Sequence, residues 1–265
     1  MKIILTMILR FFLAVLNLVA YVYAAPLEVN TSHSLEKRAN PRIGPGFSRQ
    51  EVRQISDGFQ DAIRLAQYVV FAPSDIFDPI FVKYFDIRDR RKVTDVFRRI
   101  LGLPPNLESG ARLLGDISVV VDYEDEEGDL ACDGSTGAES RNVATDHLNI
   151  IICHDLGFEN GGIFKGYPDV DPVTCESQSR RVSWRMETMG YALIHEYTHW
   201  NKLVAPPLRK GTDDLVYGPY GVREMRKSRA VNNADSYAWL ANEILWTTLC
   251  HRTYGDPRPE DDNPE

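Results

Sequence analysis

Apolar residues recur at helical spacing between residues 48 and 101, and this pattern predicts three helices in that part of the chain. The first begins after Ser48, which has the spacing of a capping box with Glu51. Shorter helices are predicted over residues 75–85 and 89–101, and the Arg-Arg pairs of the last one, at positions 90–91 and 98–99, would form its solvated face. The apolar positions of the first helix are Val52, Ile55, Phe59, Ile63, Ala66 and Val70.

Two continuous apolar runs of strand length, residues 117–123 and 147–153, predict buried strands. The polar, acidic segment between them, residues 125–140, lacks the regular ligand spacing of an EF-hand, so we interpret it as a solvated loop. Further apolar patterning predicts a largely buried helix over residues 183–204 and a last helix over residues 230–251. Many helices with few strands indicate an α+β fold, mostly helical with a small β-sheet.

Residues 1–24 have the pattern of a secretory signal peptide, with Lys2, a long apolar run, and small residues at Ala24 and Ala25. A transmembrane anchor is the alternative interpretation. The polar residues Arg10 and Asn17 interrupt the run, and the small residues at its end favour cleavage. We therefore expect a secreted, extracellular protein that has no membrane segment after the signal is removed.

Residues 25–38 are polar and end in Lys37 and Arg38, a dibasic pair typical of a processing site for a kexin-type protease. The sequence therefore predicts a short propeptide, residues 25–38, followed by a single domain over residues 39–265. Residues 255–265 are acidic and proline-rich, which predicts a disordered tail at the end of that domain.

The charge of the chain is negative and becomes more so after processing. Removing residues 1–38 takes away four basic and two acidic residues, so 26 basic and 36 acidic residues remain and the net charge changes from −8 to about −10. Such a charge disfavours binding to nucleic acid, whose phosphates are also negative. We expect the mature protein to be a monomer.

The candidate chemistry lies in the predicted helix 183–204, where His195, Glu196 and His199 have the spacing H-E-x-x-H. Residues four apart share one helix face, so the two imidazoles can bind a single metal ion with Glu196 beside it. Zinc suits imidazole ligands, and a catalytic zinc keeps one tetrahedral position open for water.

A third protein ligand must come from further along the chain. The glycine-bounded loop 211–218 offers Asp213 and Asp214, and His251 is the only later histidine. Asp235 is a further candidate and could have one of three roles. It could bind the metal, accept a hydrogen bond from the outer nitrogen of a zinc-bound imidazole, or stabilise the start of the last helix by its charge.

The sequences HEYTH (195–199), GTDDLVYG (211–218) and NNADSYAWLA (232–241) resemble the motifs of the aspzincin, or deuterolysin, zinc metallopeptidases. The resemblance extends over residues 117–250 and implies a zincin-like metallopeptidase domain, with a small sheet beside the metal-binding helix and one zinc ion per chain. Matched position by position, it implies the following roles: Asp214 as the third ligand, Tyr217 as a hydrogen-bond donor to the substrate carbonyl or oxyanion, and Asp235 as a buried acid behind the site.

Four cysteines in a secreted chain should form disulfides, and they allow three pairings. The resemblance favours Cys132 with Cys153 and Cys175 with Cys250. The sequence contains no C-x-x-C unit, so a zinc site made of cysteines is not expected.

Together these features predict a secreted zinc endopeptidase that acts on proteins or peptides, with Glu196 as the base that takes a proton from the attacking water. Strand 147–153 is the candidate for holding an extended substrate by main-chain pairing. The alternative is a non-catalytic secreted zinc-binding antigen or cell-surface protein on the same fold. Glu196 favours the enzyme, because zinc binding alone does not require a base next to the first ligand.

Overall fold

The computed structural model describes residues 41–103, 114–120, 132, 134, 136–154 and 156–262. All of them belong to one unit of the chain, Ala39–Glu265. The predicted signal peptide and propeptide, and most of the acidic loop, lie outside the described residues. Among the described residues no single helix is long and apolar enough to cross a membrane, and the one pair that reaches this length and composition together, Arg49–Phe71 with Ser74–Tyr84, is bent by 106°.

The three N-terminal helices follow the apolar periodicity closely. They are α3 (Arg49–Phe71), α4 (Ser74–Tyr84) and α5 (Arg90–Ile100). The capping box is confirmed, because the Glu51 amide donates to Ser48 Oγ at 3.2 Å and the Ser48 amide donates to Glu51 Oε2 at 2.6 Å.

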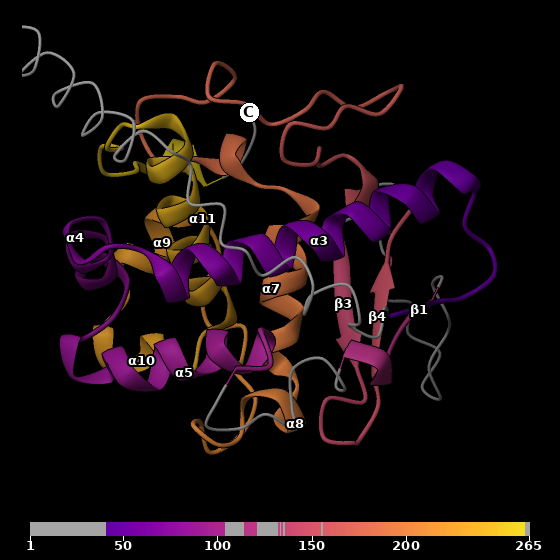
Figure 1. Cartoon of the computed structure of the whole chain (residues 1–265), viewed down its shortest axis with the longest axis horizontal. Coiled ribbons are helices and arrows are strands. Elements are labelled where there is room, and N and C mark those ends of the chain that lie inside the picture. Colours follow the sequence, from indigo (N-terminus) through magenta and orange to yellow (C-terminus); the bar gives the residue numbers. More distant parts are fainter. Residues whose placement is uncertain are drawn as a thin grey trace, which may run out of the picture. The chain divides into compact units, whose positions relative to one another are not determined.

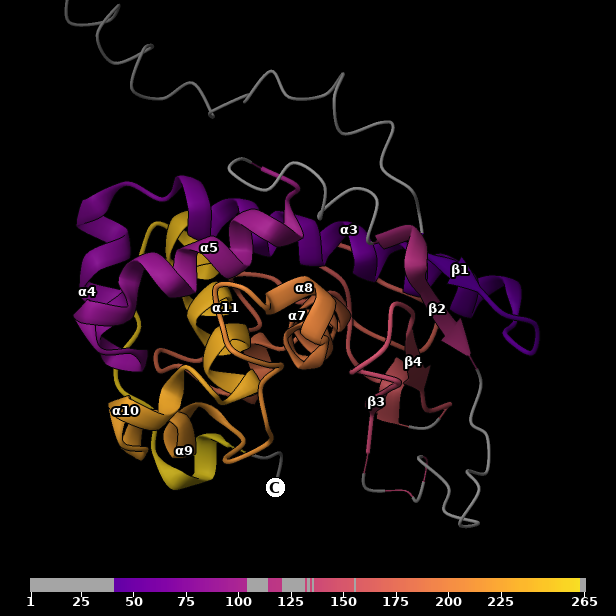
Figure 2. The same cartoon turned by 90° about the horizontal axis from the view of Figure 1, so that it is seen from below.

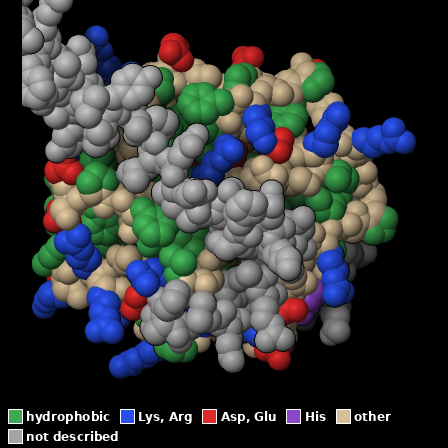
Figure 3. Space-filling view, in the orientation of Figure 1, with side chains coloured by type: hydrophobic (Ala, Val, Ile, Leu, Met, Phe, Trp, Pro, Cys, Tyr) green, Lys and Arg blue, Asp and Glu red, His purple; other side chains and the backbone are tan. Residues whose placement is uncertain are grey.

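The solvated face predicted for α5 is only partly correct. Basic side chains do project from the surface where Figure 1 places α4 and α5 (Figure 3). The Arg91 side chain is 93% exposed. Arg99 is instead buried and donates to the carbonyl oxygens of Leu203 and, at 2.9 Å, Lys202. Its guanidinium satisfies carbonyl groups at the end of a short helix, α8 (Asn201–Val204), which explains why a charge is tolerated inside.

The sheet has four short strands, β1 (Arg42–Ile43), β2 (Ile117–Val120), β3 (Ala138–Arg141) and β4 (Leu148–Ile152), in the order β1-β2-β4-β3. The first three in this order run parallel, and β3 pairs antiparallel with β4. The two predicted strands are confirmed as β2 and β4. The solvated loop predicted over residues 125–140 is wrong at its end, because its last residues form β3.

This order of strands also overturns the prediction that strand 147–153 holds an extended substrate by main-chain pairing. As β4, it is hydrogen-bonded to β2 on one side and to β3 on the other. Within the part of the chain that the structure describes, β1 and β3 are the two edge strands, and β3 is the one that packs against the helix carrying the H-E-x-x-H motif.

The predicted helix 183–204 is three pieces: η4 (Trp184–Met186), α7 (Met189–His199) and α8. Thr188 begins α7 by accepting a hydrogen bond from the Tyr191 amide at 3.2 Å. Trp200 ends it with an extended backbone, because its indole is buried and donates to the Thr145 carbonyl at 2.8 Å. The break therefore comes from tertiary packing directly after His199.

The predicted last helix 230–251 is also divided, into α10 (Lys227–Ala230) and α11 (Ala234–Cys250), with α9 (Pro219–Glu224) before them. The remaining short helices are η1 (Ile87–Asp89), η2 (Leu114–Asp116), η3 (Leu156–Phe158) and η5 (Pro259–Asp261). In Figures 1 and 2, α7 lies between the sheet on one side and α4, α9, α10 and α11 on the other.

The core lies where α3, α7 and α11 pack against one another. Burial of large apolar side chains in this region supplies the main driving force for folding, at about 25 cal/mol per Å² of apolar surface. Fully buried members of the core include Ile55, Leu65, Tyr197, Trp200, Trp239 and Trp246.

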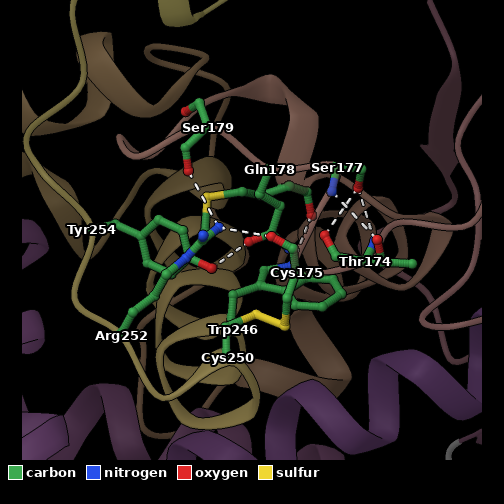
Figure 4. The surroundings of a disulfide bond; sticks show 10 residues. Thr174, Cys175, Ser177, Gln178, Ser179, Trp246, Cys250, Arg252 and Tyr254 are labelled. Carbon is green, nitrogen blue, oxygen red and sulfur yellow. Dashed lines mark hydrogen bonds between the residues drawn. A yellow bond between two sulfur atoms is a disulfide. The ribbon is translucent and has the colours of Figure 1, made fainter.

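Both predicted disulfides are confirmed. Cys132 pairs with Cys153, and Cys175 pairs with Cys250, which joins the segment before α7 to the end of α11 (Figure 4). The second bridge closes a loop that contains all three sequence motifs.

The disordered tail predicted for residues 255–265 is wrong for the residues up to Asp262. Asp261 is buried, and Asp262 accepts hydrogen bonds from the amides of Tyr220 and Gly221 at 2.6 and 3.1 Å. The acidic residues of the tail therefore find donors on the body of the protein, which a composition-based prediction does not take into account.

Candidate metal centre

The two histidines of the H-E-x-x-H motif lie one turn apart on α7, with ring centroids 5.0 Å apart. Their Nε2 atoms face the same carboxylate oxygen, Asp214 Oδ1, at 2.9 Å from His195 and 3.3 Å from His199. The three ligand atoms all lie within 4.8 Å of one another, which is close enough for one metal ion to bind them together.

The other nitrogen of each ring is held by the protein. His195 Nδ1 is 3.1 Å from Asp235 Oδ1, and His199 Nδ1 is 2.9 Å from the Thr212 carbonyl oxygen. A carbonyl oxygen only accepts, so Nδ1 of His199 carries the proton and Nε2 is left with a lone pair for a metal. The two outer contacts thus orient both rings toward Asp214.

Asp235 is buried behind the site, where four donors surround its carboxylate. Oδ1 accepts from His195 and the Tyr191 hydroxyl, and Oδ2 accepts from the Gly218 amide at 2.8 Å and the Trp239 indole at 3.0 Å. These contacts occupy both oxygens of Asp235. Asp235 is at Nδ1 of the His195 ring, whereas Asp214 is at Nε2 on the opposite side of that ring. The geometry therefore favours Asp214 over Asp235 as the third ligand.

The loop that carries Asp214 is fixed to the end of α7. Gly211 lies so close to it that an added Cβ would be 1.8 Å from the His199 carbonyl oxygen, so only glycine fits. The Gly211 amide donates to Asn201 Oδ1 at 2.5 Å, and the hydroxyls of Thr212 and Thr198 are 2.8 Å apart. The first half of the motif thus docks the loop beside the second histidine.

The third motif supports the same loop from the other side. Asn233 Oδ1 accepts from the amides of Leu215 and Val216 at 2.9 and 3.0 Å, and the Asp213 amide donates to the Asn232 carbonyl at 2.7 Å. The Asp213 side chain pairs with Lys210 at 2.8 Å instead of facing the histidines. Neighbouring aspartates of one loop therefore have different surroundings.

Tyr217 and Glu196 complete the arrangement. Tyr217 is 60% exposed, its ring stacks on His195 at 5.7 Å between centroids, and its hydroxyl faces the Asp214 carboxylate. Glu196 is 5% exposed and makes no hydrogen bond to another described residue, while its charge acts on both imidazoles and on Tyr217. A buried carboxylate and an exposed phenol thus flank the ligand cluster.

The electrostatics of the cluster reflect these contacts. Partial burial would raise the pKa of Asp214, but hydrogen bonds from His195 and His199 hold it well below its usual range. Burial would lower the pKa of His195, but Asp214 and Asp235 raise it well above its usual range. The carboxylate is therefore ionised at neutral pH, as a metal ligand must be.

Glu187 is a residue near the site that the sequence motifs do not reveal. Surrounding protein and the nearby charge of Asp235 raise its pKa to about 8, although the His195 charge opposes the shift. No spacing rule marks Glu187, because the carboxylates around it come from separate segments of the chain.

Two imidazole nitrogens and one carboxylate oxygen, with each imidazole held from behind, form the donor set that catalytic zinc sites use. The α+β fold places the two histidines on a buried helix beside one edge of a small sheet, which is the arrangement expected of a zincin-like metallopeptidase domain. Among the described residues this is the one cluster of three or more His, Cys, Asp or Glu side chains whose geometry suits a metal ion.

Comparison with known proteins leads to the same class. The aspzincin family model, described as lysine-specific metallo-endopeptidase, matches residues 173–242, which contain all three motifs. Penicillolysin from Penicillium citrinum is 35% identical over 85 residues, which cover 32% of this chain and 20% of that protein. The neutral protease 2 homologue AN7962 from Emericella nidulans is 45% identical over 51 residues, which cover 19% of this chain and 13% of that protein.

Among solved structures, a zinc peptidase from Grifola frondosa matches 74% of this chain and 97% of that chain, with a TM-score of 0.46 and 13% identity. The chain matches 20% or less of the length of the two relatives described by sequence. Within these bounds the resemblance to the aspzincin, or deuterolysin-like, family is confirmed for the segment that holds the candidate metal centre.

Proposed function

We propose that this protein is a zinc-dependent endopeptidase that binds one zinc ion per chain through His195, His199 and Asp214. The observation that carries the proposal is the convergence of both Nε2 atoms on Asp214 Oδ1, with Glu196 directly beside the first histidine. Zinc, when bound there, acts as a Lewis acid toward water and the substrate carbonyl.

The protein's own residues then divide the remaining work. Glu196 accepts a proton from the attacking water and passes it to the leaving amine, because it is close to the cluster and not engaged by another described side chain. The Tyr217 hydroxyl, already directed at Asp214, donates a hydrogen bond to the oxygen on which negative charge develops. Asp235 keeps the His195 ring oriented throughout.

Proteins or peptides are the proposed substrates, bound in extended form along β3. This strand ends the sheet among the described residues, and it packs beside α7, the helix that carries His195 and His199. Main-chain hydrogen bonds to such an edge recognise a polypeptide independently of its side chains. Figure 2 shows β3 beside α7.

Secretion, removal of residues 1–38 and a monomeric mature protein belong to the same proposal. Secretion and processing rest on the apolar run at the N-terminus and on the Lys37 and Arg38 pair. The monomer rests on the three candidate ligands, which all come from one chain. N-terminal sequencing of the protein recovered from culture medium, with its mass in solution, checks these points. A first residue other than Ala39 would contradict the processing site.

The experiment that tests the catalytic proposal is Glu196→Gln in the processed protein. Glutamine keeps the size of the side chain but cannot accept the proton, so the fold and zinc content should stay unchanged while kcat falls by roughly 10²- to 10⁴-fold. Cleavage of a broad peptide library, with and without a chelator, measures the activity, and metal analysis measures the zinc.

Glu176→Gln is the matched control and should behave as the wild type, because Glu176 is exposed and is not part of the cluster. A folded, zinc-loaded wild type that cleaves no peptide in the library would overturn the proposal. It would instead favour a zinc-binding protein without peptidase activity.

A further inference from the structure

After α11 the chain continues across the body of the protein as the segment 252–262, which we call the C-terminal strap. Arg252 donates to the Cys175 carbonyl at 3.0 Å, and its guanidinium lies over the Tyr254 ring at 4.7 Å (Figure 4). The Gly255 amide donates to the Arg180 carbonyl at 3.0 Å, and the Val182 amide donates to the Gly255 carbonyl at 3.2 Å. The strap thus pairs with the chain segment that leads into η4 and α7.

Ion pairs hold the strap in place further along. Asp261 accepts from Arg181 Nε at 2.7 Å and from the Arg258 amide at 2.8 Å, and Asp256 pairs with Arg223 of α9 at 2.5 Å. Bonds from a charged donor to a buried carboxylate are stronger than neutral ones. The end of the strap is therefore fixed relative to both α9 and the segment before α7.

The last described residue of the strap, Asp262, lies against Gly218, the last residue of the loop 211–218. Its two oxygens accept from the amides of Tyr220 and Gly221 in the first turn of α9, at 2.6 and 3.1 Å. A Cβ added to Gly218 would lie 2.4 Å from Asp262 Cγ, and the Gly218 amide donates to Asp235 on its other side. Gly218, which follows Tyr217 directly, is therefore held between two carboxylates.

We propose that Asp262 is a positioning residue for Tyr217, and thereby for the reaction assigned above. Asp262 fixes the start of α9, and the peptide that follows Tyr217 can then keep the phenol stacked on His195 with its hydroxyl toward Asp214. Tyr217 is 60% exposed and has little packing of its own to hold it. The strap supplies the constraint that the loop lacks.

The first test does not depend on activity. In Asp262→Ala the amides of Tyr220 and Gly221 should exchange with solvent roughly tenfold faster or more, because two bonds to a charged acceptor are lost. The Tyr217 ring signals in NMR spectra should move toward unstacked positions as contact with His195 is lost. Asp262→Asn, which keeps one acceptor oxygen, should give smaller changes of the same sign.

Glu260→Ala is the matched control, because this substitution also removes one negative charge from the strap. Glu260 contacts Arg181 and Arg258 and not α9. This control should change neither the exchange rates of the Tyr220 and Gly221 amides nor the Tyr217 ring signals. Unchanged Tyr217 signals in a folded Asp262→Ala protein would overturn the inference, whatever the activity of the wild type.

The second test rests on the proposed peptidase activity. Asp262→Ala should lower kcat by about 10- to 100-fold with little change in KM, because it displaces a group that acts in the transition state. Its effect should largely vanish in a Tyr217→Phe background, since the two changes remove the same interaction. Independent, multiplicative losses in the double variant would show a merely structural role. An inactive wild type would instead refute the proposed function, and the NMR comparison would still decide the positioning role.

Discussion

At the scale of single residues, two adjacent aspartates of the candidate metal centre differ in the direction of their side chains. Asp214 faces the Nε2 atoms of His195 and His199, whereas Asp213 faces Lys210 on the outer side of the loop. The difference arises because the backbone of residue 213 is pinned to Asn232 and Ala234, which turns the next side chain inward.

Asp214→Ala should therefore lower zinc affinity by more than about 100-fold, because the loss of a direct ligand costs at least as much as the loss of a residue that supports one. Asp213→Ala, the control in the same loop, should bind zinc as the wild type does. Competition with a chromogenic chelator measures both affinities. Equal zinc content in these two variants, together with an Asp235→Ala protein that holds none, would show that the ligand is assigned wrongly.

The residues that sequence could identify are those in local motifs. His195, Glu196 and His199 follow a helical spacing rule, and Asp214 and Tyr217 came from resemblance to known motifs. Asp262 and Glu187 follow no such rule, because their neighbours are contributed by α9, α11 and the segment before α7. Contacts of this kind exist only after the chain has folded.

At the scale of secondary-structure elements, predictions held where the signal is local. Helix α3 carries its own cap and its own apolar face, so its limits could be predicted to within a residue or two. Strand β3 has the sequence Ala-Glu-Ser-Arg, without apolar alternation, and it is a strand because β4 offers a partner. The breaks at Thr188 and Trp200 likewise depend on what these residues contact.

The close packing of α3 on α7 makes Gly190 a sensitive position. An added Cβ would lie 2.7 Å from Asp61 Cβ and 2.8 Å from the Ala62 amide nitrogen. Both atoms belong to α3, which crosses α7 (Figure 1). Alanine in a helix gains about 0.5–1 kcal/mol over glycine, but overpacking a core costs about 1–3 kcal/mol or more, so we expect Gly190→Ala to be destabilising.

Urea unfolding of the two proteins measures this balance. Gly137→Ala is the control, because an added Cβ there meets nothing closer than 3.6 Å, and its stability should stay within about 0.5 kcal/mol of the wild type. A Gly190→Ala protein as stable as the wild type would mean that α3 and α7 can move apart without cost.

At the scale of the whole molecule, the strap joins parts that are distant in sequence. It connects the disulfide Cys175–Cys250, the segment before α7, and α9, so that the metal centre is supported from outside as well as from the core. Asp261 is the most buried charge in this connection, at 7% exposed. Its ion pair with Arg181 should therefore contribute to stability in a way that depends on pH.

Burial would raise the pKa of Asp261, but Arg181 and the Arg258 amide hold it below its ordinary value of 3.8. A carboxyl whose pKa is depressed by folding stabilises the protein above its unfolded pKa, and this contribution is lost as the pH falls through the folded pKa. Asp261→Asn should thus be less stable than the wild type at pH 7 by about 1–3 kcal/mol, the usual contribution of hydrogen bonds to a charged group. The difference should shrink steadily below about pH 4.

Chemical denaturation at a series of pH values tests this expectation, with Asp256→Asn as the control on the same strap. Asp256 is 86% exposed, so the loss of its pair with Arg223 should cost no more than about 1 kcal/mol. If the gap between Asp261→Asn and the wild type keeps its size down to about pH 2, its cause is not the ionised carboxylate. The strap would then be held by shape and neutral hydrogen bonds instead of by charge.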